Sequence, residues 1–286
     1  MSPNKDCPVC ARPLSLGLQP WHVQCSHCGY EGAGLEPKIN QQASHALIDE
    51  AAREDGLEQL RKANFARLLD EIARVKGGGG RLLDVGCAHG WFLEMAAGRY
   101  EVTGIEPDDV VASATRARGL PVRAGYFPQV LAADERFDVI VFNDVIEHIP
   151  DIRSVLAACH HHLQDGGLLV LNLPNSDGFF YRLSRLLSRL GVNGFFERLW
   201  QKDFPSPHVH YFNPRNLQQL LANTAFEQQR GGRLETLNRK GLYTRIAYSK
   251  ENGALRNGIV YLGALASIPF LRMLPADIFF SVSKKR

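Results

Sequence analysis

The stretch from Arg81 to Glu106 constrains the fold more than any other part of this sequence, because its residue types follow a fixed structural order. An apolar run ends in Asp84-x-Gly86-x-x-x-Gly90, a helical pattern follows, and a second apolar run ends in Glu106. This order is that of a strand, a glycine-rich turn, a helix and a second strand that ends in an acid. Glycines let the backbone approach a ligand, and an acid about 20 residues further on can accept hydrogen bonds from ribose hydroxyls. The stretch therefore predicts a nucleotide-type ligand at the end of a parallel sheet.

The remainder of the chain repeats the alternation of strands and helices. Continuous apolar runs at 137–143 and 168–173 predict buried strands, and apolar residues at three- and four-residue steps predict a helix over 55–76. Further helices are predicted over 108–118, 151–163 and 215–223, and later strands over 226–239 and 278–282. This alternation favours an α/β fold with a doubly wound, mostly parallel sheet.

Two segments interrupt the alternation. Residues 176–212 are aromatic and basic and show no strand pattern, so we expect a lid-like insertion over the ligand site. Residues 250–275 are apolar but contain Gly263, Pro269 and Arg272, and we expect an insertion that packs on the fold as an extra helix. Both segments leave open a peripheral contact with a membrane surface, although their basic residues are scattered.

Four of the six cysteines form two pairs near the start of the chain. Cys7-x-x-Cys10 and Cys25-x-x-Cys28 have the spacing of two zinc knuckles. We therefore expect a structural zinc ribbon over residues 1–34, followed by a linker over 35–54 and a catalytic domain over 55–286. Zinc would replace the hydrophobic core that a segment of this size cannot build. The charges of the ribbon are balanced, which makes nucleic acid an unlikely partner and favours a structural or protein-docking role.

Composition excludes several other classes. The net charge of +3 is too small to indicate a polyanionic partner, and 45% hydrophobic and 22% charged residues are usual for a globular protein. The first residues, MSPNKDCPVC, have no apolar core of the signal-peptide type. No apolar run reaches the ~18 residues of a membrane span. We therefore expect a cytoplasmic protein, with peripheral membrane contact as an open alternative.

The motifs LLDVGCAHG, GIEP, FNDVIEHIPD, DGGLLVLNLPN and HVHYFNP together resemble class I methyltransferases that use S-adenosylmethionine (SAM), of the ubiquinone-type and saccharide-type subgroup. The resemblance covers residues 55–286 and implies a seven-stranded Rossmann-like sheet and SAM as the methyl donor. The family usually has a second glycine where Ala88 stands. By position, the resemblance implies that the following residues line the SAM site: Asp84, Gly86, Cys87, Gly90, Glu106, Pro107, Asn143 and Asp144.

Methyl transfer to a hydroxyl group benefits from a base that accepts its proton. Candidate bases are His148, His208 and His210, with Asp144 as a weaker one. Asp144, Glu147 and His148 also have the spacing of one helical face, and a similar cluster binds a divalent metal in some methyltransferases that this chain resembles. A histidine from residues 208–210 could complete such a metal site. The alternative is that these acids only begin a helix and that the histidine is hydrogen-bonded.

Three functions remain open at this point. The first is O-methylation of a small molecule, a sugar or a lipid-linked glycan. The second is methylation of RNA presented by the zinc ribbon, although the fourth predicted strand lacks the Asn/Asp-Pro-Pro-aromatic motif that often holds a base amino group. The third is a scaffold without activity, against which the complete set of cofactor residues argues.

Overall fold

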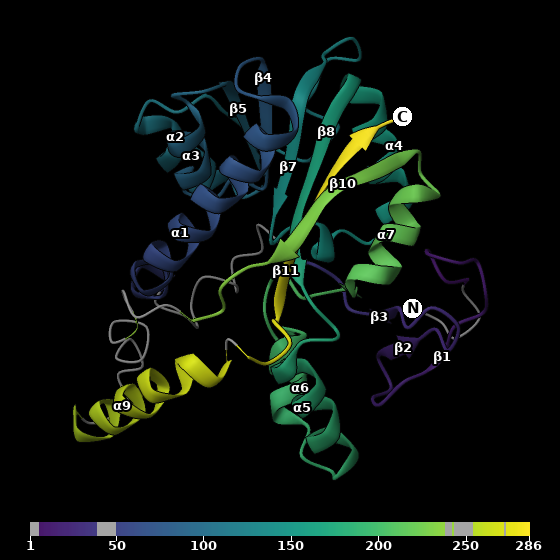
Figure 1. The fold of residues 1–286 in the computed structure, drawn as a ribbon, viewed down its shortest axis with the longest axis vertical. Coiled ribbons are helices and arrows are strands. Elements are labelled where there is room, and N and C mark those ends of the chain that lie inside the picture. The colour runs from purple at the N-terminus through teal and green to yellow at the C-terminus, as the bar shows by residue number, and fades with distance from the viewer. Residues whose placement is uncertain (1–5, 39–49, 238–241, 243–253, 272) are drawn as a thin grey trace.

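The computed structural model describes residues 6–38, 50–237, 242, 254–271 and 273–286. A seven-stranded sheet forms its centre, in the order β10-β11-β8-β7-β4-β5-β6, and Figure 1 shows it edge-on between two groups of helices. The strands are β4 (Arg81–Val85), β5 (Glu101–Glu106), β6 (Val122–Ala124), β7 (Phe137–Asn143), β8 (Leu163–Pro174), β10 (Phe226–Arg233) and β11 (Ile278–Lys285). The first five run parallel, and β11 is antiparallel to both β8 and β10. The predicted doubly wound, mostly parallel sheet of seven strands is therefore confirmed.

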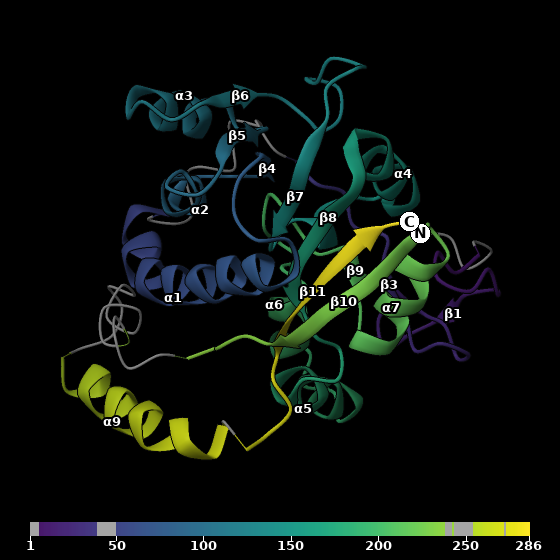
Figure 2. The same ribbon diagram turned by 45° about the horizontal axis from the view of Figure 1, so that its top comes forward.

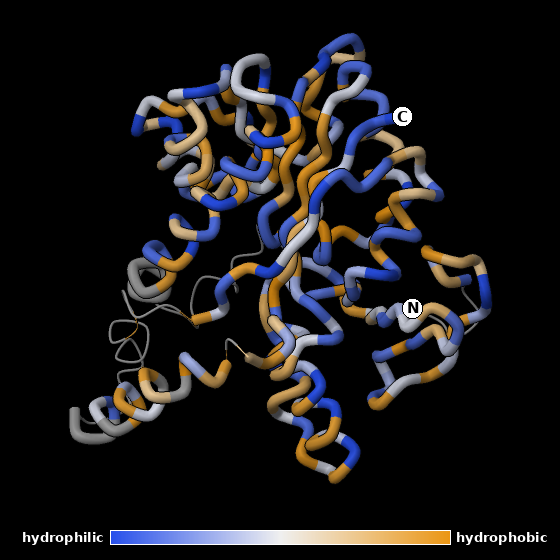
Figure 3. The backbone as a smooth tube through the Cα atoms, in the orientation of Figure 1, coloured by the Kyte–Doolittle hydropathy of each residue, from blue (hydrophilic) through white to orange (hydrophobic). Residues whose placement is uncertain are grey.

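The central strands are apolar on both faces because helices cover both. Along β7, Val139 and Val141 point into one cluster while Ile140 and Phe142 point into the other. The helices are α1 (Glu50–Lys76), α2 (Trp91–Ala96), α3 (Asp109–Ala117), α4 (Ile152–His162) and α7 (Pro214–Ala222). The helices α1 and α2 pack with the first cluster, whereas α4 and α7 pack with the second. The hydropathy colouring shows these buried strands as continuous hydrophobic segments (Figure 3).

The start of β8 differs from the sequence-based expectation. We expected Gly166 and Gly167 to separate a helix from a strand that begins at Leu168, but β8 already begins at Leu163. The pairing of β7 with β8 shifts register between Phe137 and Val139, and Gly166 has a φ of 71° at this irregularity. A glycine tolerates this left-handed conformation, so the strand bulges instead of ending.

The absence of a strand from residues 176–212 was a wrong prediction. This insertion contains α5 (Phe179–Arg189), α6 (Gly194–Leu199) and a two-residue strand, β9 (His210–Tyr211). A strand of two residues has no recognisable alternation, which explains why the pattern missed it. It completes a second sheet, in the order β1-β2-β3-β9.

The other three strands of the second sheet come from the cysteine-rich ribbon. They are β1 (Ser15–Leu16), β2 (His22–Gln24) and β3 (Glu31–Ala33), and all pairings in this sheet are antiparallel. The ribbon lies beside α7, as both views show (Figures 1 and 2). Its Val9, Leu14 and Tyr30 share a hydrophobic cluster with Phe212 and Leu217 of the main body. The expected linker at 35–54 lies largely outside the described residues, and residues 50–54 belong to α1.

The expected apolar insertion at 250–275 forms α9 (Ala254–Leu271), while residues 250–253 and 272 lie outside the described part. Within the described residues, no helix has both the length and the apolar character that crossing a bilayer requires. In Figures 1 and 2 this helix extends away from the central sheet.

Candidate functional site

A cavity of about 1290 Å³ lies at the carboxyl ends of β4, β5, β7 and β8. One side is lined by α1 and by the loops after β4 and β5, and the other by the insertion that carries α5 and α6. Pockets for a single small ligand typically measure about 300–1,000 Å³. The cavity can therefore hold a cofactor and an acceptor molecule at the same time.

The glycine-rich turn after β4 requires left-handed backbone at three positions. Gly86, Ala88 and Gly90 have φ angles of 70°, 44° and 72°. A side chain at Gly86 would place its Cβ 2.6 Å from Val145, and one at Gly90 would lie 2.4 Å from Leu120. The two glycines are therefore needed both for conformation and for space, whereas Ala88 occupies a conformation that alanine adopts at a cost.

Glu106 is held rigidly at the end of β5 and lines the cavity. Its two carboxylate oxygens accept hydrogen bonds from the backbone amides of Ala88 and Asp108, each at 2.9 Å. Burial raises the pKa of this carboxyl group above its ordinary value. A carboxylate has about four lone-pair sites, so the two that remain can accept the two hydroxyl groups of a ribose.

The other expected cofactor residues divide into two groups. Gly86, Pro107 and Asp144 line the cavity together with Glu106. The residues Asp84, Cys87, Gly90 and Asn143 are not among the lining residues. The last of them donates a hydrogen bond of 3.4 Å to Asp84, and burial raises the pKa of that carboxyl group to about 8. These four therefore lie beneath or behind the cavity wall.

A cluster of titratable side chains lies in the cavity wall where the turn after β7 meets the insertion. It consists of Glu147, His148 and His208, whose nearest nitrogen and oxygen atoms all lie within 4.8 Å of one another. The first two belong to a short 3-10 helix, η2 (Ile146–His148), and Val209 donates a backbone hydrogen bond of 2.8 Å to Glu147. The turn after β7 therefore meets the end of the insertion at this cluster.

This grouping differs from the expected set of Asp144, Glu147 and His148. Asp144 has a φ of 55°, so the chain turns sharply before η2 and no helical face joins it to the other two residues. The third member of the cluster is His208, one of the two histidines of residues 208–210 that were expected as a possible further ligand, and the insertion supplies it from 60 positions beyond His148. Spacing within one motif gave no information about this partner.

A hydrogen bond to the backbone defines the tautomer of His148. Nδ1 of His148 lies 2.9 Å from the carbonyl oxygen of Pro207, so it carries the proton in the neutral ring and Nε2 holds the lone pair. Burial lowers the pKa of His148 to about 4 and that of His208 well below its ordinary value. The two rings lie 4.7 Å apart, and Nδ1 of His208 and one oxygen of Glu147 have no hydrogen-bond partner. Both rings are therefore neutral, and the cluster retains unused hydrogen-bonding capacity.

His210, the third candidate base, lies outside the cavity. Its Nδ1 is 2.5 Å from the hydroxyl of Tyr30, and its Nε2 is 2.9 Å from the carbonyl oxygen of Ile149. Both ring nitrogens are engaged and the side chain is fully buried. The arrangement connects the ribbon to the loop after η2, and it leaves no nitrogen that could take a proton from an acceptor.

Sequence reasoning missed several residues that line the cavity. Among them are Arg61 and Asn64 of α1, Asn172 of β8 and Tyr181 of α5. The side-chain oxygen of Asn172 is buried without a hydrogen-bond partner. A signal for it existed, because Asn172 is the one polar residue in the apolar run from Leu168 to Leu173. The contribution of Tyr181 depends on the fold of the insertion and had no local signal.

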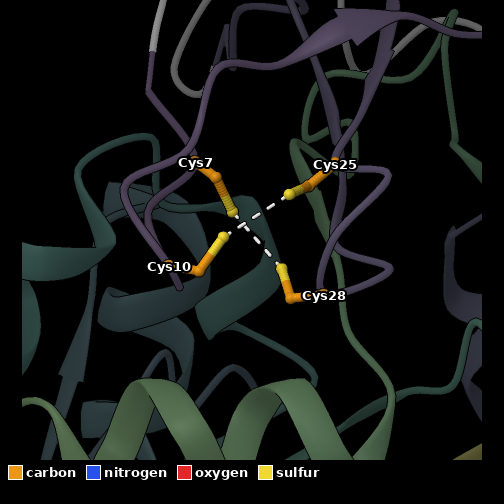
Figure 4. Close-up of side chains that lie close together, drawn as sticks. All are labelled: Cys7, Cys10, Cys25 and Cys28. Carbon is orange, nitrogen blue, oxygen red and sulfur yellow. Dashed lines mark hydrogen bonds between the residues drawn. The ribbon is translucent and has the colours of Figure 1, made fainter.

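The four ribbon cysteines converge on one point (Figure 4). Sγ of Cys7 lies 3.5 Å from that of Cys28, and Sγ of Cys10 lies 3.5 Å from that of Cys25. Four sulfurs around a tetrahedral zinc at about 2.3 Å would lie ~3.8 Å apart, whereas a disulfide requires about 2.05 Å. The geometry and the donor set therefore fit a tetrahedral metal ion better than two disulfides.

The model of a methyltransferase domain matches residues 57–229. A ubiquinone biosynthesis O-methyltransferase of Alkalilimnicola ehrlichii is 32% identical over 117 residues, which cover 37% of this chain and 47% of the relative. A protein of the same name from Xanthomonas oryzae pv. oryzae is 35% identical over 124 residues, covering 41% and 52%. The chain thus spans about half the length of the curated relatives it matches.

Solved structures share the fold at low sequence identity. A SAM-dependent methyltransferase from Thermotoga maritima aligns with a TM-score of 0.57 at 15% identity, covering 84% of this chain and 96% of that one. A mycolic acid cyclopropane synthase complexed with SAH aligns with a TM-score of 0.58 at 18% identity, covering 79% and 85%. The turn after β4, the carboxylate at the end of β5 and the family match agree with one another: the chain belongs to the methyltransferase domain family.

Proposed function

We propose that this enzyme methylates a hydroxyl group of a small acceptor molecule and that His148 is the base that accepts the hydroxyl proton. The observation that carries the proposal is the neutral His148 ring in the cavity wall, with Nδ1 fixed on the Pro207 carbonyl and the basic nitrogen at Nε2. A hydroxyl group is a weak nucleophile until its proton is removed, so a positioned base favours O-methylation over transfer to an unprotonated amine. The names of the matched relatives, O-methyltransferases, support the same acceptor chemistry.

The chemistry needs few steps from the protein. SAM supplies a methyl group on a sulfonium, and sulfur leaves with the bonding electron pair when the acceptor oxygen bonds to the methyl carbon. Glu106 and the turn around Gly86 orient the cofactor, and Nε2 of His148 takes the acceptor proton. The insertion covers the cavity with Tyr181 and His208, which excludes water and fixes the approach of the acceptor.

The test is a screen with methyl-labelled SAM against phenols, catechols, sugars and lipid-linked sugars, each paired with its amine analogue. We expect label in at least one hydroxyl compound and none in its amine partner. Transfer to the amines alone would reject the proposal. Transfer to an RNA oligonucleotide would instead favour the alternative in which the ribbon presents RNA.

The same cluster is the alternative site for a divalent metal. The expected ligands were Asp144, Glu147 and His148 with a histidine from residues 208–210, and the cluster in the structure supports a set of Glu147, His148 and His208 without Asp144. Two histidines and a carboxylate suit zinc, manganese or iron(II). Turnover after EDTA treatment separates the two roles: activity that persists supports His148 as a base, and activity restored only by added Mn²⁺ or Zn²⁺ supports the metal.

We propose zinc as the ion at Cys7, Cys10, Cys25 and Cys28, on the basis of the tetrahedral fit. Four thiolates from two short knuckles form a closed structural site with no open coordination position. Elemental analysis should give about one zinc per chain, none in Cys25→Ser, and an unchanged content in Cys159→Ala, which removes a thiol from α4. Absence of zinc from the wild-type protein would reject this assignment.

We also propose that the tip of the α5–α6 hairpin contacts an anionic lipid surface, which would suit a lipid-linked acceptor. Leu186, Leu190 and Val192 are exposed there beside the exposed Arg182 and Arg189, so apolar and basic groups share one surface. Vesicles that contain anionic phospholipid should bind the wild-type protein and release a Leu190→Ser/Val192→Ser variant. Leu16→Ser, an exposed leucine of the ribbon, serves as the control, and equal binding by all three proteins would contradict the proposal.

A further inference from the structure

The zinc-ribbon segment packs on the insertion that forms one wall of the cavity. Trp21 of the ribbon stacks on Phe196 of α6 with ring centroids 5.8 Å apart, and it also meets Trp200 edge-on at 5.6 Å. At the far end of the hairpin, the side-chain amide of Gln19 donates to Asn193 at 2.8 Å. One hydrophobic cluster contains residues of both segments: Ala33, Tyr181, Phe196, Trp200 and Tyr211, with Leu18, Trp21 and Leu35 beside it. The ribbon and the insertion therefore form one packing unit.

Glu31 is the charged centre of this unit. It is 3% exposed, and one carboxylate oxygen accepts a hydrogen bond of 2.9 Å from the hydroxyl of Tyr181. The other oxygen pairs with Arg185 at 2.8 Å, and Nε2 of His22 lies 2.9 Å from the first. Burial of a carboxylate has a large desolvation cost, which its hydrogen-bonding and ionic partners offset. Because Glu31 needs these three partners, it also fixes their positions. Through Tyr181 this network reaches the cavity wall.

The ribbon strand β3 also holds the segment that carries His208. Glu31 and Gly32 pair with Tyr211 and His210, and Ala33 donates a backbone hydrogen bond of 3.0 Å to Val209. The Tyr30–His210–Ile149 chain extends this support to the residue next to His148. Both cavity histidines thus depend on contacts that begin in the ribbon.

The cofactor side of the cavity receives no such support. In the described part of the chain, the hydrogen bonds and ion pairs that residues 6–38 make outside the ribbon run to residues 181–223. The turn around Gly86 is instead held by Ile105 and Glu106 within its own half of the sheet.

We infer that the ribbon is an internal support of the acceptor side of the active site and that Glu31 is its positioning residue. Glu31 orients Tyr181 and the His208 segment without touching the acceptor, while cofactor binding is left to residues 81–108. The inference rests on the proposed function, because that function makes the wall formed by α5, α6 and β9 the acceptor side. In this view the cysteine site stabilises a ribbon that supports the active site of the same chain, and it does not serve to dock a separate partner.

Hydrogen–deuterium exchange on the full chain tests the inference without a known acceptor. In Glu31→Ala, peptides over 178–212 should exchange about tenfold faster or more, because loss of a buried charge-assisted network lowers the local opening free energy. Peptides over 81–106 should be unchanged, and the SAM dissociation constant should change less than twofold. Glu31→Gln, which keeps an acceptor for Tyr181, should restore part of the protection. Glu101→Ala, an exposed acid at the start of β5, is the control.

Tyr181→Phe removes one hydroxyl and should raise exchange in the same peptides, which keeps the test valid if Glu31→Ala does not fold. With an acceptor from the labelled-SAM screen, Glu31→Gln should raise the acceptor KM while the SAM KM stays constant. Equal acceleration in 81–106 and 178–212, or no acceleration in either, would overturn the inference. Failure of the screen alone would reject the proposed function but leave the exchange result in place.

Discussion

The two sides of the cavity are built in different ways. The cofactor side is made of residues close together in the chain, since Gly86, Ala88 and Glu106 interact within 20 positions and one strand–turn–helix–strand unit fixes them. The acceptor side joins distant segments, because Tyr30 meets His210 and Glu31 meets Tyr181 across 180 and 150 positions. The residues expected to bind the methyl donor therefore belong to one local unit of the sequence, whereas the wall that we propose for the acceptor is assembled from the ribbon and the insertion.

We expect the largest effect on stability from substitutions that remove the metal site of the ribbon. Cys25→Ser combined with Cys28→Ser removes two of four metal ligands, and we expect a loss of at least about 3 kcal/mol in the free energy of unfolding, since such sites contribute directly to folding. Thermal and urea unfolding followed by tryptophan fluorescence measures it. In this variant the acceptor side should lose its structure first, so the protein should still bind SAM at temperatures and urea concentrations below the main unfolding transition. Coincident loss of SAM binding and ribbon structure would contradict the division.

On the cofactor side, Glu106→Ala should weaken SAM binding about 30- to 100-fold. The variant removes two charge-assisted hydrogen bonds to ribose, together worth roughly 2–3 kcal/mol. Calorimetric titration measures the affinity, and exchange over 178–212 should stay at the wild-type level. Glu101→Ala on the same strand controls for loss of an acid, and an unchanged affinity in Glu106→Ala would remove the ribose role.

A third prediction concerns the pH dependence of the cofactor half. Hydrogen bonds from Arg123 at 2.7 and 2.8 Å lower the pKa of Glu135 from 4.5 to about 2, with Arg81 as a further donor. A depressed pKa means that the stabilisation is complete above the unfolded value and is lost as the pH falls from about 4.5 to 2. Glu135→Gln should therefore lower the free energy of unfolding by about 2 kcal/mol at pH 7, after allowance for solvent screening. At pH 3 the loss should be less than half of that. Urea unfolding at both pH values measures this loss. If wild type and Glu135→Gln differed by the same free energy at pH 7 and pH 3, Glu135 would not titrate as described.

The smallest effect is expected at Ala88. The left-handed conformation costs an alanine about 1–2 kcal/mol. Glycine avoids this cost, but its unfolded chain has more conformational entropy, which offsets part of the gain. Ala88→Gly should therefore stabilise the protein by about 0.5 kcal/mol and leave SAM affinity equal or slightly improved. Destabilisation by this change would mean that the alanine methyl group makes contacts that outweigh the backbone strain.

The sequence predicted the sheet, and the place of Glu106 at the end of β5, for a physical reason. Apolar runs, glycines and a terminal acid are local signals, so β4, β5, β7 and Glu106 could be placed without tertiary information. The acceptor side could not be placed, because β9 has only two residues and its partner strand lies 180 positions away. The left-handed Asp144 removed the expected helical face, and His210 became a buried link to Tyr30 instead of a base. The errors at β9 and His210 concern contacts between distant segments, whereas the error at Asp144 is a local left-handed conformation that residues other than glycine rarely adopt.

The most direct test of the account is methyl transfer by His148→Ala beside wild type, with SAM affinity measured on the same preparations. If His148 is the base on the acceptor side, kcat should fall about 10²- to 10⁴-fold while the SAM dissociation constant stays within twofold. A kcat near the wild-type value, or an equal loss in kcat and SAM affinity, would contradict both the assigned base and the separation of the two sides.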